Sequence, residues 1–506
     1  MHNVWKKVNR LTNSLLLAKL GTQPEIREVV DQIARLLPGT QLLGIQSSFA
    51  PLPESVIPIA REETLLLGAF DDWWAQQLYV DPMLYVKLLP RESQLLRMAE
   101  RVAIHDLYEL EHPRFPAEKF TDDFDGRMQL LLRHIAFWDW VIKSKHVEAV
   151  VGQNLPHNFW DAVLYEVAVA RGIPYLCFHE VRPFLNCLYI YESPNEMGNL
   201  TFGRELISRT SQRYGWIEES KPRKSLMRHQ VSPDNAVANR EAGTQKDFTF
   251  YSRLQRLLTK PRFIPQKLYR FVRRRIGSSY AQRSKPRLVD CREIQQPFFL
   301  MELQAQSNAT TLLKGYMYGD PREMIAHVAD CLPEGTSLVI CESSREKSRR
   351  RPRRKQFWTQ VASLPSVHIA DTAPDMNSLL ERSSGLIELG YSSIALAAIN
   401  KGVPVVLLGL THLPKLPNTY HVKTKEQLRE ALLDSISNSG GRVQSESIGE
   451  ALEEWVESTR AATIEGTLSS FPRVAETEQQ YVARVVNNVA HLVATWFEMR
   501  VPQSRS

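Results

Sequence analysis

The chain has 506 residues, a formal net charge of +7, 43% hydrophobic residues and 24% charged residues. This composition is typical of a globular protein, and the length exceeds what one hydrophobic core usually serves, so we expect two or more domains. No apolar stretch reaches the roughly 18–20 residues that a membrane-spanning helix needs. A protein with a transmembrane helix is therefore not expected.

The five cysteines are scattered along the chain and form no C-x-x-C pair. This spacing argues against a structural zinc site and against a disulfide framework. Free cysteines are typical of a reducing compartment, so we expect a cytoplasmic protein.

Helix-like and strand-like segments alternate in residues 1–210. An amphipathic pattern predicts a helix over residues 124–145, and a β-rich run follows at 147–154. A second helix is predicted over 159–172 and a second strand over 173–180. Strand, helix, glycine and strand in this order indicate a βαβ unit, and hence a parallel sheet in a Rossmann-like first domain.

Residues 211–290 are polar and then basic, and we interpret them as a linker with short helices. Residues 248–289 contain twelve Lys or Arg and no Asp or Glu, and residues 345–355 contain eight Lys or Arg. Such clusters attract anionic partners, but they are equally typical of a solvated linker and a solvated loop. In "LYRFVRRRI" (268–276), aromatic and apolar residues alternate with arginines as in an interfacial helix. Residues 248–289 are therefore a candidate contact with an anionic membrane surface.

The alternation of strands and helices resumes at residue 291 and predicts a second Rossmann-like domain over residues 291–465. Residues 466–506 are predicted to form a helical tail that packs back on the lobes. The expected fold class is thus α/β, with two doubly wound domains, a basic linker and a C-terminal helical tail. In such folds ligands bind at the carboxyl ends of the strands, and the cleft between two lobes is the natural place.

A short segment within residues 386–409 joins a predicted strand to a predicted helix. Gly390 can adopt a positive φ, and Ser392 or Ser393 can cap the following helix. The first backbone N–H groups of that helix, together with its dipole, would suit a phosphate of a nucleotide-sugar. A plain N-cap on a buried helix fits the same pattern equally well.

Three segments resemble the capsular-polysaccharide glycosyltransferases of GT-B fold, which include the β-Kdo transferase group and its uncharacterised relatives. The first is "YSSIALAAINKGVPVVLLG" (391–409), the second is "NLPHNFWDAVLYEVAVARGIP" (154–174), and the third covers residues 307–343. The matching residues are Ser392, Ser393, Ala398, Gly402, Pro404 and Val405 in the first, Pro156, His157, Asp161, Leu164, Tyr165 and Ala168 in the second, and Thr310, Thr311 and Gly315 in the third.

The resemblance implies a GT-B glycosyltransferase of capsular or surface polysaccharide biosynthesis. Such an enzyme moves a sugar from a nucleotide-sugar to a glycan or a lipid-linked acceptor. It needs no metal and no other cofactor, and the sequence itself shows no metal-ligand constellation and gives no expectation of nucleic-acid binding. We expect it in the cytoplasm or peripherally on the inner face of the cytoplasmic membrane. The residues expected to bind the donor are Gly390, Ser392, Ser393, Glu342, Arg345, Thr310 and Thr311.

Two departures from the family pattern weaken the expected donor site. The family's carboxylate in the helix after the serines is Ala397 here, and its glycine is Ala395. The family's His-Pro step after Glu342 is replaced by two serines. The alternative is therefore a catalytically degenerate relative that serves as a binding or scaffold subunit of a polysaccharide assembly complex.

Polar residues after the two strands of the first domain suggest an acceptor site. Asn154, His157 and Asp161 stand at offsets 0, 3 and 7 between a strand and a helix. His157 or Asp161 could be the base that takes the proton of the attacking hydroxyl. The alternative is that Asn154 and Asp161 cap the helix. The residues expected to contact the acceptor are Asn154, His179, Glu180 and Arg182.

Overall fold

The computed structural model describes the chain as two compact units: a first domain of residues 1–224 and 458–506, and a second domain of residues 225–457. Across the described residues, none of the helices has both the length and the apolar character that a membrane crossing requires. The residues described are 13–18, 27–46, 52–61, 65, 80–101, 124–156, 158–180, 184, 187–193, 196–215, 221–231, 289, 294, 297–303, 318, 320–342, 355–370, 376–390, 392–438, 445–466, 468 and 478–501.

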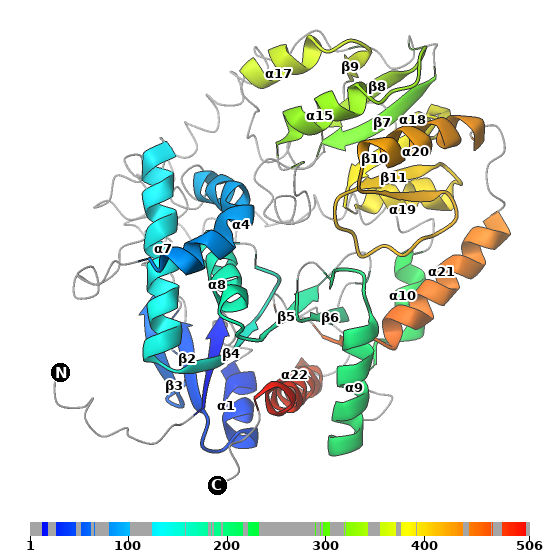
Figure 1. Cartoon of the computed structure of the whole chain (residues 1–506). Helices are drawn as coiled ribbons and strands as arrows, with labels where there is room; N and C mark the ends of the chain where they lie inside the picture. Colours follow the sequence, from blue (N-terminus) through cyan, green and yellow to red (C-terminus); the bar gives the residue numbers. More distant parts are fainter. Residues whose placement is uncertain are drawn as a thin grey trace, which may run out of the picture. The chain divides into compact units, whose positions relative to one another are not determined.

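The first domain contains a seven-stranded sheet in the order β13-β6-β5-β4-β1-β2-β3 (Figure 1). The five strands from β3 to β5 are parallel, and β6 and β13 are antiparallel additions at one edge. The order 3-2-1-4-5 is that of a doubly wound Rossmann-like sheet, so the predicted class of this domain is confirmed. The strands are β1 Ser14–Ala18, β2 Gln41–Gln46, β3 Val56–Arg61, β4 Val147–Gly152, β5 Tyr175–Glu180, β6 Cys187–Tyr191 and β13 Thr463–Glu465.

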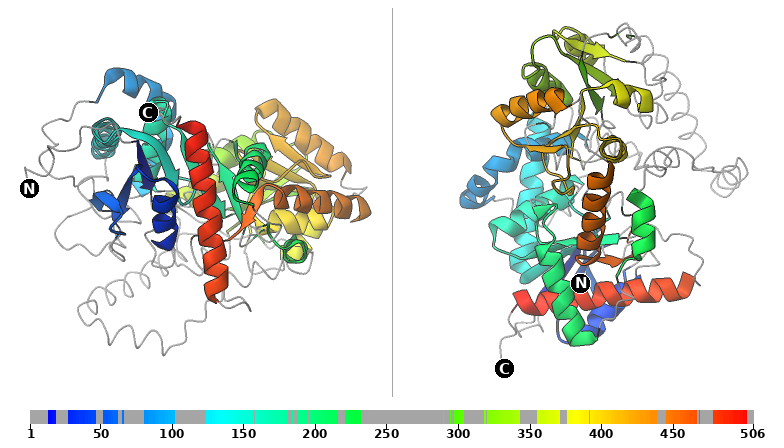
Figure 2. Two further views of the ribbon diagram at one scale, coloured as in Figure 1. Left: turned by 90° about the horizontal axis from the view of Figure 1, so that it is seen from below. Right: turned by 90° about the vertical axis from the view of Figure 1, so that its right-hand side faces the viewer.

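The helices of the first domain form two groups, one of α1, α9 and α22 and one of α4, α7 and α8. Figure 2 shows α22 lying beside α1 and α9. Alternate strand residues such as Leu15, Leu17 and Val151 are fully buried with the apolar faces of α1 and α22. The bounds are α1 Arg27–Leu36, α4 Pro82–Arg101, α7 Phe124–Ser144, α8 Phe159–Ala170, α9 Thr201–Tyr214 and α22 Glu478–Arg500.

The C-terminal part of the chain belongs to the first domain. We predicted that the second domain extends to residue 465, but the chain returns to the first domain at Ser458. Residues 463–465 form β13, which pairs antiparallel with β6 at the sheet edge. The reason is the hydrogen-bonding capacity of that edge: an unpaired strand offers N–H and C=O groups that even three extended residues can satisfy.

The second domain contains a six-stranded sheet in the order β12-β11-β10-β7-β8-β9, in which every pairing is parallel. Counted from β7, this is the order 3-2-1-4-5-6 of a Rossmann-like sheet, again as predicted. The strands are β7 Phe298–Leu303, β8 Ser337–Glu342, β9 Val367–Ile369, β10 Gly385–Leu389, β11 Val405–Leu408 and β12 Thr419–Val422. The helices are α10 Lys224–Val231, α15 Pro321–Ala329, α17 Lys355–Ala362, α18 Met376–Arg382, α19 Ser393–Asn400, α20 Lys425–Asn438 and α21 Ser445–Arg460.

Two helices that carry the predicted sites end in the same way. The segment after α8 has Gly172 at φ +73°, and the Ile173 N–H donates to the Ala168 carbonyl over 2.9 Å. The segment after α19 has Gly402 at φ +69°, and Val403 makes the equivalent bond. Glycine adopts this left-handed conformation without steric cost, which is why both "RGIP" and "KGVP" end a helix and start a strand.

Gly203 in α9 allows close approach of the chain before β13. A Cβ at this position would meet the Ala462 carbonyl oxygen at 2.5 Å, whereas one at Gly449 in α21 would meet nothing within 4 Å. Glycine to alanine usually stabilises a helix by about 0.5–1 kcal/mol, but an overpacked contact costs about 1–3 kcal/mol. We therefore expect Gly203→Ala to lower and Gly449→Ala to raise the free energy of unfolding, measured by urea denaturation. A stabilising effect at both positions would contradict the close approach.

His134 in α7 is fully buried, and its ring meets that of Phe159 edge-on with centroids 4.9 Å apart. Burial lowers the pKa of His134 to about 3. The unfolded chain therefore takes up this proton at a higher pH than the folded protein does, and stability declines as the pH falls below about 6.5.

We expect the loss of unfolding free energy between pH 7.5 and 5.5 to be about 1 kcal/mol smaller in His134→Leu than in the unsubstituted protein. Urea denaturation at both pH values measures it. Gln129→Ala, at an exposed position of the same helix, is the control and should leave the pH dependence unchanged. An equal pH dependence in all three proteins would contradict this role of His134.

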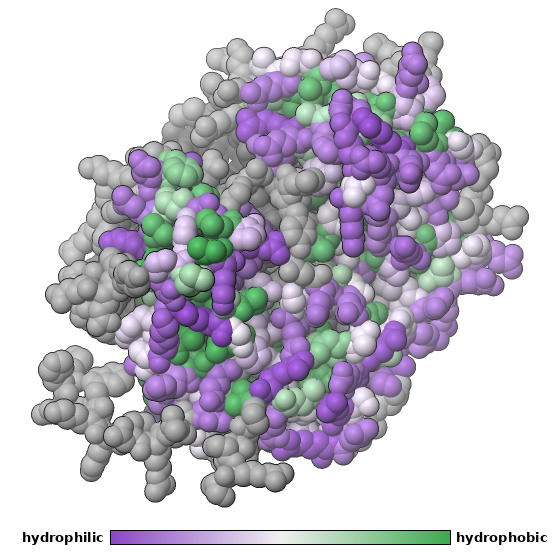
Figure 3. All heavy atoms as spheres, viewed as in Figure 1, coloured by the Kyte–Doolittle hydropathy of each residue, from purple (hydrophilic) through white to green (hydrophobic). Residues whose placement is uncertain are grey.

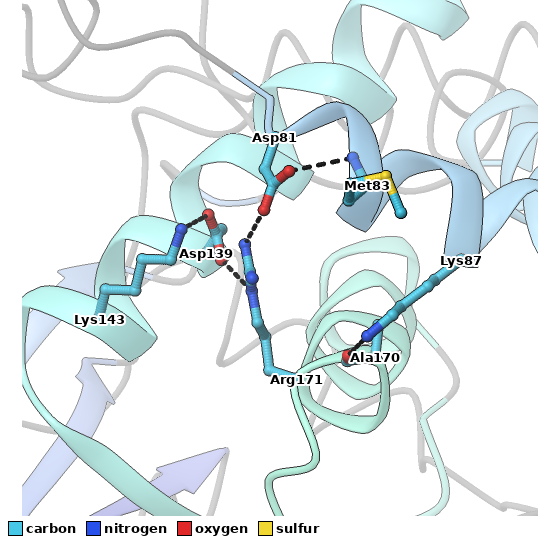
Figure 4. Close-up of polar contacts among 7 residues, drawn as sticks. All are labelled: Asp81, Met83, Lys87, Asp139, Lys143, Ala170 and Arg171. Atoms are coloured by element: carbon cyan, nitrogen blue, oxygen red, sulfur yellow. Dashed lines mark hydrogen bonds and ion pairs between the residues drawn. The ribbon is translucent and has the colours of Figure 1, made fainter.

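An ion-pair network joins the three helices α4, α7 and α8 (Figure 4). Arg171 follows α8, and its Nε donates to Asp139 Oδ1 over 2.7 Å while Nη2 donates to Asp81 Oδ2 over 2.8 Å. The second oxygen of Asp139 accepts a bond of 2.7 Å from Lys143. The Arg171 guanidinium lowers the pKa of Asp81, which also accepts a bond from the Met83 N–H at the start of α4.

The first half of α4 is apolar on its outer face as well as on its buried face. Met83, Val86 and Leu89 are 67%, 54% and 46% exposed, and Leu84 and Leu88 are buried. Figure 3 shows hydrophobic side chains over the region of α4, between polar ones. Of residues 248–289, the candidate membrane contact, only Val289 lies among the described residues.

Candidate functional site

The strand order of the second domain has its switch point between β7 and β10. From β7 the chain continues to β8 on one side, and from β10 it continues to β11 on the other. In doubly wound folds, ligands bind at the carboxyl ends of the strands at such a switch point. Gly390, Ser392 and Ser393, here together called the serine turn, follow β10 at this point.

The serine turn is held by hydrogen bonds within the protein. Gly390 has φ +78°, and its N–H donates to the Leu408 carbonyl over 2.9 Å. Ser392 is the N-cap of α19, and its Oγ accepts a bond of 3.2 Å from the Ile394 N–H. The same hydroxyl donates to Glu388 Oε1 over 2.7 Å. Ser392 therefore caps the helix, which both interpretations of the sequence allow.

Glu388 is a functional candidate that the sequence did not reveal. It lies in β10 between apolar residues and is only 2% exposed. A buried carboxylate is costly unless it is hydrogen-bonded or paired, and Ser392 supplies one such bond. The signal in the sequence was a single acidic residue inside an apolar strand, four residues after Ser384.

The other predicted donor residues are placed only in part. Ser393 is the first residue of α19 and is half-buried. Glu342 is the last residue of β8, and its backbone lies opposite Leu303 at the carboxyl end of β7. The structure thus brings Gly390, Ser392 and Ser393 into one turn and places Glu342 at the same edge of the sheet. Arg345, Thr310 and Thr311 lie outside the described residues.

The first domain has its own switch point between β1 and β4, and Asn154 follows β4 there, half-buried. The neighbouring Gln153 is held on both sides: its N–H donates to the Ala18 carbonyl over 3.1 Å, and its side chain donates to the Leu468 carbonyl. The segment after β13 therefore lies against the carboxyl end of β4.

Asp161 lies at the start of α8 and is 4% exposed. Its Oδ1 accepts a bond of 2.7 Å from the Asn158 N–H, and its Oδ2 accepts one of 3.2 Å from the Asn158 side chain. Asn158, not Asn154, is the N-cap of this helix. Burial raises the pKa of Tyr175 well above its usual value, and the charge of Asp161 adds to the shift. His157 lies outside the described residues, so the predicted pairing of His157 with Asp161 stays a prediction.

His179 and Glu180 end β5, and both are half-buried. As neighbours in a strand they point to opposite faces of the sheet, so a ligand on one face contacts only one of them. Glu180 shares its face with Phe178, which packs in the core formed with α22. Arg182 lies outside the described residues.

A buried charged cluster near Glu180 was not predicted. Glu465 ends β13, is 5% exposed, and its Oε2 lies 3.2 Å from Arg484 Nη2 of α22. Burial raises the pKa of Cys187, whose backbone pairs with Glu465, and burial also raises the pKa of Tyr481. Because these residues are separated by up to about three hundred positions, no local pattern in the sequence could reveal the cluster.

Among the described residues, no group of three or more His, Cys, Asp or Glu side chains is arranged to hold a metal ion. The described parts of both candidate sites consist instead of helix caps, hydroxyls and single carboxylates. Such groups can bind hydroxyls and amides of a ligand by hydrogen bonds.

Comparisons with known proteins gave similarities to solved structures only. No protein-family model matches the chain, and the search of curated proteins gave no match. A UDP-GlcNAc 2-epimerase from Methanocaldococcus jannaschii is 12% identical, with 88% of this chain and 98% of that chain covered, at a TM-score of 0.27. A glycosyltransferase from Rickettsia africae is 9% identical, with 96% and 99% covered, at a TM-score of 0.26. The spinosyn rhamnosyltransferase SpnG is 12% identical, with 89% and 98% covered, at a TM-score of 0.22. These scores are too low to support a shared function, and the two Rossmann-like domains are assigned from their strand orders.

Proposed function

We propose that this chain is a metal-independent glycosyltransferase of capsular or surface polysaccharide biosynthesis. It would transfer a sugar from a nucleotide-sugar to a glycan or lipid-linked acceptor. One observation carries the proposal: the serine turn, whose sequence resembles that of GT-B capsular enzymes, follows β10 at the switch point of the second sheet. This is the position at which Rossmann-like domains bind nucleotides.

In this proposal the second domain binds the donor. The backbone at Gly390 and the half-buried Ser393 contact it at the turn, and Glu342 contributes from the end of β8. Arg345, Thr310 and Thr311 bind the phosphates, since guanidinium and hydroxyl groups suit phosphate oxygens.

The first domain binds the acceptor in the same proposal. Asn154, Arg182 and one of the two strand neighbours His179 and Glu180 contact it, and His157 is the base that removes the proton of its attacking hydroxyl. Asp161, whose oxygens accept two bonds from Asn158 at the start of α8, orients His157 in this proposal. The enzyme would work in the cytoplasm, with residues 248–289 against the anionic inner face of the membrane.

The alternative is a scaffold subunit without catalysis, and one observation favours it. Ala397, which stands where the resembling family has a carboxylate, is 7% exposed in α19 and offers no hydrogen bond from its side chain. A scaffold would keep the fold of both domains but would not bind a nucleotide-sugar.

Thermal unfolding with a panel of CMP-, UDP- and GDP-sugars tests the proposal. A ligand at 100-fold over its Kd stabilises the folded state by about 2.7 kcal/mol. We expect one nucleotide class to give this shift, and Ser393→Phe to abolish it by filling the turn. The control is Glu426→Phe, an exposed position in the first turn of α20. If no nucleotide-sugar of the panel raises the unfolding temperature of the folded protein, the scaffold is favoured. If the Ser393→Phe variant shows the same rise in unfolding temperature, the nucleotide binds elsewhere.

A further inference from the structure

We propose that the hydroxyl of Tyr175 binds a sugar hydroxyl of the acceptor at the carboxyl end of β4. This inference rests on the proposed function, because it adds a contact to the acceptor site of the first domain. It makes Tyr175 a binding residue and assigns the acceptor to the face of the sheet on which α8 packs.

The first argument is the position of the Tyr175 side chain. Tyr175 begins β5, yet a Cβ at Gly152 would lie only 2.6 Å from its hydroxyl oxygen and 3.1 Å from the carbonyl oxygen of Asn154. Gly152 is the last residue of β4, so this glycine leaves room for the hydroxyl at the switch point between β1 and β4. Ligands of doubly wound folds bind at such a point.

The second argument is that the Tyr175 hydroxyl is buried without a hydrogen-bond partner among the residues that the structure describes. Tyr175 is 3% exposed, and its ring meets that of Tyr165 edge-on with centroids 5.1 Å apart. The Tyr165 hydroxyl, in contrast, is hydrogen-bonded to Ser193 over 2.9 Å. A buried polar group without a partner lowers the folding equilibrium constant by about 5- to 150-fold, and a phenylalanine would avoid this cost. We therefore expect a ligand to supply the partner.

The third argument is the chemistry of the hydroxyl. Burial holds the pKa of Tyr175 well above its usual value, so the hydroxyl stays neutral and can donate a hydrogen bond. A sugar hydroxyl can accept this bond, and a neighbouring hydroxyl of the same sugar can donate to the nearby Asn154 carbonyl. A neutral donor beside a carbonyl acceptor thus suits an acceptor rich in hydroxyl groups.

The position of Tyr175 also decides between the two strand neighbours at the end of β5. Side chains alternate along a strand, so His179 lies on the face of Tyr175, and Glu180 lies on the opposite face with Phe178. Phe178 packs in the core formed with α1 and α22, whereas Tyr175 contacts Tyr165 of α8. A ligand at the Tyr175 hydroxyl therefore has His179, and not Glu180, on its side of the sheet.

Ligand-observed NMR titration of the full chain tests the inference, with the methyl glycosides of glucose, galactose, N-acetylglucosamine and glucuronic acid as probes. Tyr175→Phe removes the hydroxyl and keeps the ring. We expect at least one glycoside to bind the unsubstituted protein and to bind this variant about 3- to 10-fold more weakly. The matched control is Tyr165→Phe, which removes the hydroxyl of the neighbouring ring and should change glycoside affinity less than 2-fold.

Thermal unfolding of the same variants without ligand separates a binding role from a structural one. Tyr165→Phe should lower the unfolding temperature by about 2–4 °C, because it breaks the bond to Ser193. Tyr175→Phe should unfold at or above the temperature of the unsubstituted protein. An equal decrease in both variants would show that the Tyr175 hydroxyl is bonded within the protein, and the inference would be wrong.

Two results of the titration would also overturn the inference: equal glycoside affinity of the Tyr175→Phe and unsubstituted proteins, or no glycoside binding at all. The nucleotide-sugar panel above would still decide the proposed function. Glycoside binding that depends on Tyr175, in a protein to which no nucleotide-sugar binds, would instead overturn sugar transfer and leave the Tyr175 contact standing.

Discussion

Replacing Trp496 by alanine is expected to lower the free energy of unfolding of the first domain by about 3–5 kcal/mol. Trp496 is fully buried in the core shared by α22, α1 and the sheet. Its Nε1 donates to Glu192 Oε1 over 2.6 Å, and Arg500 Nε donates to the same oxygen over 2.5 Å. The substitution creates a large cavity and removes one of the bonds that attach α22 to the end of β6.

Urea denaturation followed by circular dichroism measures this loss, since fluorescence would change with the tryptophan itself. Gln480→Ala, at an exposed position in the first turn of the same helix, is the control and should cost less than about 0.5 kcal/mol. Trp496→Phe keeps most of the apolar volume, so its loss of unfolding free energy should lie between those of Trp496→Ala and Gln480→Ala. Equal stability of the Trp496→Ala and Gln480→Ala proteins would show that α22 is not part of the first core.

Replacing Arg171 by alanine is expected to cost the first domain about 3 kcal/mol. The side chain of Asp139 is 8% exposed, and Arg171 is its partner from a different helix. Removing one member of a buried ion pair costs about 3–5 kcal/mol because the remaining charge stays buried. Lys143 continues to bind the second oxygen of Asp139, which places the effect at the lower end of this range.

Chemical denaturation at pH 7 measures the effect, with Lys143→Ala as the matched control. The Lys143 side chain is 56% exposed, so its loss should cost only about 0.2–1 kcal/mol. Adding Asp139→Asn to Arg171→Ala should recover part of the loss, because the uncompensated charge disappears with it. A double variant that is less stable than Arg171→Ala alone would contradict the importance of this pair.

The sequence predicted the two Rossmann-like domains because their elements are encoded locally. "RGIP" after α8 and "KGVP" after α19 each contain a glycine that ends a helix and a proline that precedes a buried strand. Such signals depend on the φ angle of one residue and on nearby apolar residues, so they can be recognised without a structure.

The features that the sequence did not reveal depend on distant contacts. β13 has only three residues and becomes a strand because β6 offers a free edge more than 270 positions earlier. The Asn158 cap, which our alternative interpretation had placed at Asn154, depends on where α8 begins within a polar segment. Glu388 is buried because β10 lies inside the sheet, between β11 and β7. That position depends on the order of the strands in the sheet.

The position of α22 in the first core has a consequence for biosynthesis. Except for β13, every strand of the first sheet has been translated once the ribosome reaches Tyr191, yet the helix that covers those strands comes from residues 478–500. Domains usually fold in the order in which they emerge during translation. Here the second domain can be complete while the first still exposes apolar strands, so this chain should depend on chaperones until its translation is almost finished.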